Sequence, residues 1–183
     1  DRFFYGIIIT MNTRLRFLAV PWKNDLLERF LRYVVIDTTS DRNIAETPTS
    51  AGQWELARLL VEELKALGIA NVQLTEHCYV IARIPASQGA VHLPSLALMA
   101  HLDTASDVCG KAVLPQVHEN WDGTALKLKN NIQLSPADFP ELNNYIGDTI
   151  ITSDGQTLLG ADDKAGIAVI MTALSCILKE GLP

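Results

Sequence analysis

Residues 158–166 read Leu158-Leu159-Gly160-Ala161-Asp162-Asp163-Lys164-Ala165-Gly166 and join a short apolar segment to the most apolar helical stretch of the chain. Two adjacent acids stand at this junction, where an unpaired buried charge costs several kcal/mol. A bound metal ion would account for them, because it pairs with carboxylate oxygens. The partner that we expect for Asp162 is His101, which also stands at the end of an apolar segment.

Three helices are expected from the spacing of apolar residues. Asn24 and Asp25 can cap the first, which should end near Asp37. The second begins at the capping-box pattern Ser50-Ala51-Gly52-Gln53 and should end at Gly68. The third starts at Asp163 and is apolar nearly all round, which predicts a central position.

Strands are expected at 71–75, 78–84 and 95–101. The last is a continuous apolar run, typical of a strand covered on both faces. A weak strand at 125–128, a short helix from Ser135 to about Gly147, and a hairpin of 149–152 with 157–159 complete the expectation. The predicted fold class is therefore α/β, with a mixed β-sheet sandwiched between helices.

Composition limits the class of protein. The chain has 183 residues, is 48% hydrophobic and carries a net charge of -6. One domain is expected, and no nucleic-acid partner. Cys78, Cys109 and Cys176 lie far apart, which fits a reducing compartment, and we expect a cytoplasmic protein.

The two ends of the sequence differ from the rest. The apolar run 3–9 is too short to span a bilayer and lacks signal-peptide order, so residues 1–23 are interpreted as an N-terminal appendage and no membrane role is expected. Residues 179–183 read as a helix stop, although an α/β chain should next enter a strand. We therefore expect that the chain is cut there.

His101 and Asp103 should share one face of a strand end, because side chains alternate along a strand. One ring nitrogen can then bind a metal while the other donates to Asp103. Asp162 offers two oxygens and can bridge two cations about 3.5–4 Å apart. Asp163 can cap the following helix, and Lys164 would balance charge locally.

The residues alone leave this interpretation open. A His-x-Asp triplet is common by chance, and an Asp-Asp pair at a helix start is most often a plain cap. His77, His92 and His118 lie in loop-like or amphipathic contexts and are not expected to be ligands. Cys109 is expected to pack within a loop.

Four stretches resemble the peptidase T family of tripeptide aminopeptidases, which are di-zinc exopeptidases related to carboxypeptidase G2 and acetylornithine deacetylase. They are 25–31 (DLLERFL), 50–54 (SAGQW), 100–104 (AHLDT) and 152–166 (TSDGQTLLGADDKAG). The last block separates this family from its broader relatives. The resemblance covers about 24–183, which it identifies as the N-terminal part of a metallopeptidase catalytic domain.

The resemblance implies a role for each matching residue. His101 would be a ligand of one zinc ion, Asp162 the carboxylate shared by two zinc ions, and Asp103 the catalytic residue that supports His101. The Asp162–Asp163 peptide bond is often cis in such proteins. The implied activity is release of the N-terminal residue of tripeptides by a zinc-activated water.

Other parts of the family pattern have no counterpart here. The Glu-Glu pair that supplies the base, further Asp and His ligands, and the smaller lid domain used for dimerisation are absent from these 183 residues. Glu62 and Glu63 are not expected to replace the base, because they lie in an amphipathic helix and should face solvent. The chain alone should bind zinc weakly and be inactive, and a homodimer would need the missing domain.

Alternative functions remain at this point. One is a non-catalytic truncated product or binding remnant with the same fold and no metal. Another is a different di-zinc peptidase or deacylase. A magnesium phosphatase with paired aspartates is disfavoured, because that chemistry wants an aspartate where His101 stands.

Overall fold

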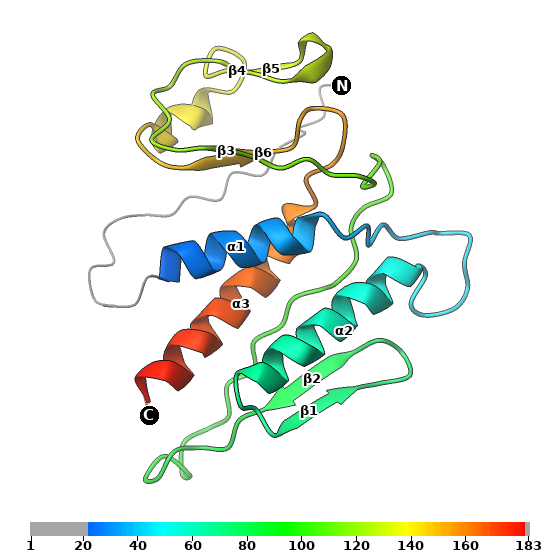
Figure 1. Cartoon of the computed structure of the whole chain (residues 1–183), viewed down its shortest axis with the longest axis vertical. Coiled ribbons are helices and arrows are strands. Elements are labelled where there is room, and N and C mark those ends of the chain that lie inside the picture. The colour runs from blue at the N-terminus through cyan, green and yellow to red at the C-terminus, as the bar shows by residue number, and fades with distance from the viewer. Residues whose placement is uncertain (1–21, 182–183) are drawn as a thin grey trace.

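The computed structural model describes residues 22–181, which combine α-helices with short antiparallel strands (Figure 1). The helices are α1 (Trp22–Val34), α2 (Ala51–Ala66) and α3 (Ala161–Glu180). The strands are β1 (Asn71–Leu74), β2 (Val80–Arg83), β3 (Gln116–His118), β4 (Leu126–Lys127), β5 (Gln133–Leu134) and β6 (Ile150–Thr152). Two 3-10 helices, η1 (Lys129–Asn131) and η2 (Pro140–Tyr145), lie between them. The mixed α/β composition that the sequence predicted is confirmed.

The main hydrophobic core lies where the helices meet (Figure 1). The helix α1 crosses α3, and α2 covers the antiparallel pair β1–β2. Side chains spaced three or four residues apart on each helix enter this core, as amphipathic helices require. Its most buried members are Phe30, Tyr33, Val34, Leu56, Leu159 and Ala168.

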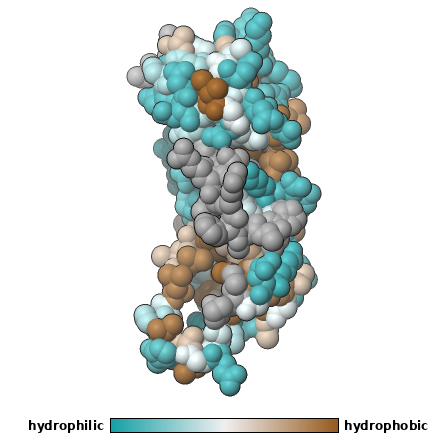
Figure 2. All heavy atoms as spheres, turned by 90° about the vertical axis from the view of Figure 1, so that its left-hand side faces the viewer, coloured by the Kyte–Doolittle hydropathy of each residue, from teal (hydrophilic) through white to brown (hydrophobic). Residues whose placement is uncertain are grey.

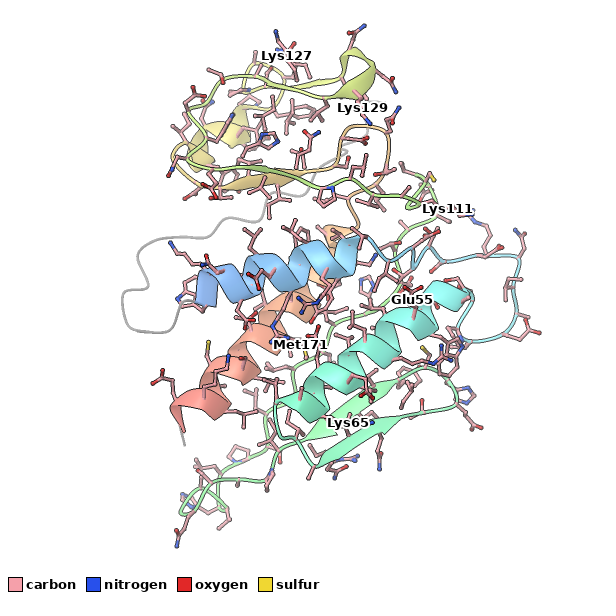
Figure 3. The ribbon with its side chains drawn as sticks, in the orientation of Figure 1. Glu55, Lys65, Lys111, Lys127, Lys129 and Met171 are labelled. Carbon is pink, nitrogen blue, oxygen red and sulfur yellow. The ribbon has the colours of Figure 1, made fainter. Side chains whose placement is uncertain are left out.

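A second, smaller core supports the upper lobe in Figure 1, which contains the pairs β3–β6 and β4–β5 together with η2. Its centre consists of Trp121, Leu134, Leu142 and Ile150. Lys129, labelled in Figure 3, places its Nζ 2.9 Å from Oδ2 of the buried Asp154. This ion pair lowers the pKa of Asp154 and holds the loop that leads from β6 to α3.

The predicted strand at 95–101 is wrong for the described residues. None of the three two-stranded sheets contains it, and Leu96 and Met99 are 85% and 89% exposed. A strand needs hydrogen-bonded neighbours, and within residues 22–181 no strand pairs with this segment. The first pairing beyond it is the parallel bridge between Thr39 and Thr104.

The predicted hairpin of 149–152 with 157–159 is also wrong. The strand β6 pairs instead with the distant β3, and Ile151 faces Val117. Residues 153–157 form a loop closed by Ser153, whose Oγ donates to Thr157 O at 2.8 Å. The helix expected from Ser135 to Gly147 is shorter, because only η2 forms there.

The helix starts differ in detail from the predicted caps. The helix α1 begins at Trp22, ahead of the expected caps Asn24 and Asp25. The capping box at Ser50 does not form: its Oγ finds no partner among the described residues, and Gln53 Oε1 accepts from Thr49 N at 3.2 Å. Gln53 is instead turned toward the loop after α1, where its Nε2 donates to Thr38 O at 3.3 Å.

The surface combines polar and apolar regions. Figure 2 shows mostly hydrophilic atoms over the upper lobe and more apolar atoms in the lower half of that face. Among residues 22–181 no helix has the length and apolar character needed to cross a bilayer. The predicted appendage at 1–23 lies almost wholly outside the described residues, since these begin at Trp22.

The contrast between Leu56 and Leu96 gives a direct test of this architecture. Leu56 is fully buried, so Leu56→Ala should lower the free energy of unfolding by roughly 2–5 kcal/mol. Leu96→Ala removes the same atoms from an exposed position and should change it by less than about 0.5 kcal/mol. Urea denaturation measures both. A comparable loss for the two variants would show that 95–101 is buried, as the sequence pattern had predicted.

Candidate metal centre

The structure brings His101 and Asp162 together across 61 residues of chain. His101 Nε2 lies 2.9 Å from Asp162 Oδ1. Both side chains are more than half exposed, with 52% and 74% of their surface accessible. The predicted convergence of these residues is therefore present, whereas their role as metal ligands stays a prediction.

Asp103 contacts the other nitrogen of the same ring. His101 Nδ1 lies 3.0 Å from the Asp103 carbonyl oxygen and 3.2 Å from Asp103 Oδ1. A ring held in this way has a fixed orientation, and a proton on Nδ1 leaves the Nε2 lone pair free for an ion. The geometry matches the supporting position that the sequence predicted for Asp103.

The backbone at the start of α3 presents Asp162. Gly160 has φ +74, and a Cβ there would lie 3.2 Å from Thr104 Cγ2, so this position favours glycine. Asp162 and Asp163 have non-helical dihedral angles, and the bond between them is cis, which confirms the expectation from the resemblance. Asp163 Oδ1 accepts from Gly166 N at 3.2 Å, so its predicted capping role is confirmed.

Lys164 has a different place from the one expected. It is buried rather than balancing the neighbouring acids, and its Nζ donates to Ile36 O at 2.6 Å. Burial lowers the pKa of Lys164 to about 8, while the nearby Asp37 acts in the opposite direction. This hydrogen bond ties the start of α3 to the loop that follows α1.

That loop, residues 36–40, also supports Asp103. Ser40 N donates to Thr104 O at 3.0 Å, and Thr104 N donates to Thr38 O at 3.2 Å. Ser40 Oγ donates to Asp103 Oδ2 at 2.6 Å. Ser40 and the buried partner of Lys164 were not predicted from the sequence. The available signal was the run 37–40 (DTTS), short polar residues that follow a helix without continuing it.

The remaining candidates lie elsewhere. His118 Nε2 lies 3.1 Å from Thr152 Oγ1, and burial lowers the pKa of His118. His77 lies beside Glu76 on the surface, and His92 is exposed. Cys109 is exposed rather than packed, and its contact with the site region is through the backbone, where its carbonyl accepts from Leu158 N at 2.9 Å.

Glu63 corrects another expectation. Its side chain is only 15% exposed rather than facing solvent, because Arg29, Arg32 and Tyr33 on α1 all bond to its carboxylate. Tyr33 Oη donates to Glu63 Oε2 at 2.6 Å. Glu62 is solvent-facing as expected, with its side chain 72% exposed. Glu63 thus joins α1 to α2 and has no contact with His101.

The donor set suits zinc but is incomplete in this part of the chain. Zinc accepts imidazole nitrogen and carboxylate oxygen, and two such ligands on a tetrahedral ion lie roughly 3.3 Å apart. The 2.9 Å between Nε2 and Oδ1 is close to that separation. Within residues 22–181, however, no group of three or more His, Cys, Asp or Glu residues is arranged to hold an ion.

Several curated proteins similar to the chain are named peptidase T. Peptidase T of Geobacillus thermodenitrificans (strain NG80-2) is 52% identical over 160 residues, which cover 86% of this chain and 39% of that protein. Peptidase T of Bacillus anthracis is 51% identical over 158 residues, with 85% and 38% covered. The chain is a relative of peptidase T. No protein-family model matches it.

The chain spans about 39% of the length of peptidase T relatives such as that of Geobacillus sp. (strain WCH70), which is 50% identical over 160 residues. The resemblance to peptidase T found in the sequence is thereby confirmed. Over the matched stretch, peptidase T and this chain share about half their residues.

The ion pairs at His101 predict a pH-dependent contact. Burial alone would lower the pKa of His101, but the hydrogen bond to Asp162 and the contacts with Asp103 raise it. Because the pKa of His101 is higher in the folded chain than its unfolded value of about 6.5, these contacts stabilise the folded state. The stabilisation is fully present below the unfolded pKa and is lost as pH rises through the folded pKa. In the metal-free chain, Asp162→Asn should therefore lower the pKa of His101, as measured by NMR titration.

Asp163→Asn is the matched control, because the Asp163 carboxylate accepts from Gly166 N within α3. It should leave the His101 titration nearly unchanged. An equal shift from both variants would indicate that His101 senses net charge rather than contact with Asp162.

Proposed function

We propose that this chain is the N-terminal part of the catalytic domain of a di-zinc aminopeptidase that releases the N-terminal residue of tripeptides. The observation that carries the proposal is the convergence of His101 and Asp162 within 2.9 Å, at the two sequence blocks that resemble peptidase T. Relatives named peptidase T support the peptidase assignment.

Each residue of the site would have a distinct task. His101 Nε2 and Asp162 would hold zinc, with Asp162 shared between two ions. Asp103 would keep the ring of His101 in place and hold a proton on Nδ1. Zinc, when bound, lowers the pKa of a water ligand and polarises the scissile carbonyl. The exposure of both ligands would let a small peptide approach them.

Other residues would complete the centre. A structural zinc site has four ligands, and a catalytic one has three and a water, whereas this chain contributes His101 and Asp162. The base and the other ligands would come from the remaining length of a peptidase T protein. The isolated chain would then bind zinc weakly and lack activity, and any dimer would form through a further domain.

The same proposal predicts a larger sheet than the short strand pairs seen in residues 22–181. The exposed apolar residues Leu96, Leu98 and Met99 would become part of a mixed sheet sandwiched between helices once further strands pair with them. We further propose a cytoplasmic enzyme with zinc as cofactor and small peptides as substrates.

A chimera tests the proposal. Residues 24–183 would replace the matching stretch of Geobacillus thermodenitrificans peptidase T, which shares 52% of the matched residues. The chimera should hydrolyse tripeptides in the presence of zinc. His101→Ala and Asp162→Ala should each lower kcat/KM by at least about 100-fold, the upper range for loss of a supporting residue around a metal.

His92→Ala is the matched control, since His92 is an exposed histidine away from the site. It should leave kcat/KM nearly unchanged. A folded chimera that hydrolyses tripeptides equally well without His101 would contradict the assignment. A folded chimera with no activity would favour a non-catalytic role.

A further inference from the structure

Asp103 is held by a side chain from a distant part of the chain. Ser40 Oγ donates to Asp103 Oδ2 at 2.6 Å, across 63 residues of sequence. The other carboxylate oxygen, Oδ1, then lies 3.2 Å from His101 Nδ1. The contacts form a line from Ser40 through Asp103 and His101 to Asp162.

Ser40 is itself fixed by its backbone. Its N–H donates to Thr104 O, and the Thr39–Thr104 bridge aligns the two segments in parallel. The loop is anchored at its start by Lys164, whose Nζ donates to Ile36 O. Gly52 lets α2 approach the same loop, since a Cβ there would lie 1.7 Å from Asp37 O. The Ser40 hydroxyl thus comes from a rigid support.

The Asp103 carboxylate needs such a support. Its side chain is 47% exposed, so without a donor on Oδ2 it could rotate toward water. The Asp103 carbonyl oxygen would still face Nδ1 at 3.0 Å, but the carboxylate contact would be lost. A carboxylate that accepts a hydrogen bond from a fixed hydroxyl keeps one oxygen aimed at the ring.

The direction of that carboxylate matters because His101 lies between two acids. Asp103 favours a proton on Nδ1, and Asp162 Oδ1, 2.9 Å from Nε2, favours a proton on Nε2. A ring nitrogen that carries a proton has no lone pair to offer a metal ion. Metal binding through Nε2 is therefore favoured when the contacts with Asp103, which favour a proton on Nδ1, outweigh the contact with Asp162, which favours a proton on Nε2.

We propose that Ser40 is a positioning residue that aims Asp103 at His101 and so favours the tautomer protonated at Nδ1, the form that can bind a metal ion through Nε2. The effect of Ser40 on metal binding rests on the proposed function. The tautomer itself is a property of the chain without metal.

The first test uses the metal-free 183-residue chain and the 15N shifts of the neutral His101 ring, which distinguish the two tautomers. In Ser40→Ala the population should move from Nδ1–H toward Nε2–H, and Ser40→Thr, which keeps the hydroxyl, should restore it. Ser106→Ala is the matched control, because the Ser106 hydroxyl meets Arg42 on the surface and not Asp103. It should leave the shifts unchanged.

The second test measures zinc affinity in the chimera. Ser40→Ala should weaken binding about 10–100-fold, the usual effect of losing a supporting residue around a metal, and Ser40→Thr should recover most of it. In the double variant Ser40→Ala/Asp103→Asn, the loss should equal that of Asp103→Asn alone, because both act through one contact.

The outcomes separate the two proposals. If folded Ser40→Ala leaves both the tautomer and the zinc affinity unchanged, Ser40 has no positioning role and the proposed function stands. If Ser40→Ala shifts the tautomer but the wild-type chimera binds no zinc, the positioning role stands and the proposed function is wrong. If Ser40→Ala fails to fold, Asp103→Asn replaces it in the NMR test, and an unchanged tautomer in that variant overturns the inference.

Discussion

The hydrogen bond from Lys164 Nζ to the Ile36 carbonyl is the constraint on which the site depends. It joins the start of α3 to the loop after α1, and Lys164 is only 2% exposed. Burying such a group is costly unless it is hydrogen-bonded, so the position of the loop is strongly determined. From this loop Thr38 and Ser40 bind the segment that carries Asp103, while α3 presents Asp162. The packing of α1 against α3 thus determines where Asp103 and Asp162 lie relative to each other.

The helices could be predicted from the sequence because helical periodicity is a local property. Leu26, Phe30 and Val34 recur on one face of α1 and are buried as the pattern indicates. Strands depend on partners that local sequence does not identify. The apolar run 95–101 has the composition of a buried strand, yet no strand within residues 22–181 pairs with it. Likewise β6 found its partner in β3, more than 30 residues earlier, and not in the adjacent 157–159.

The same distinction applies to the site. His101, Asp103 and Asp162 could be selected because each residue type has metal chemistry and stands at the end of an apolar segment. Ser40 could not, since a serine acquires its role here only through a contact with Asp103 across 63 residues. Lys164 was misplaced for a related reason: its sequence neighbours are acids, but its side chain turns inward to Ile36. Side chains that hold other side chains are the part of a site that local sequence conceals.

The central claim is that His101 and Asp162 bind the same metal centre. Anomalous diffraction at the zinc absorption edge, on crystals of the zinc-loaded chimera, tests it most directly. The claim predicts a zinc peak about 2.0–2.2 Å from both His101 Nε2 and a carboxylate oxygen of Asp162. Zinc peaks that contact neither residue would contradict it.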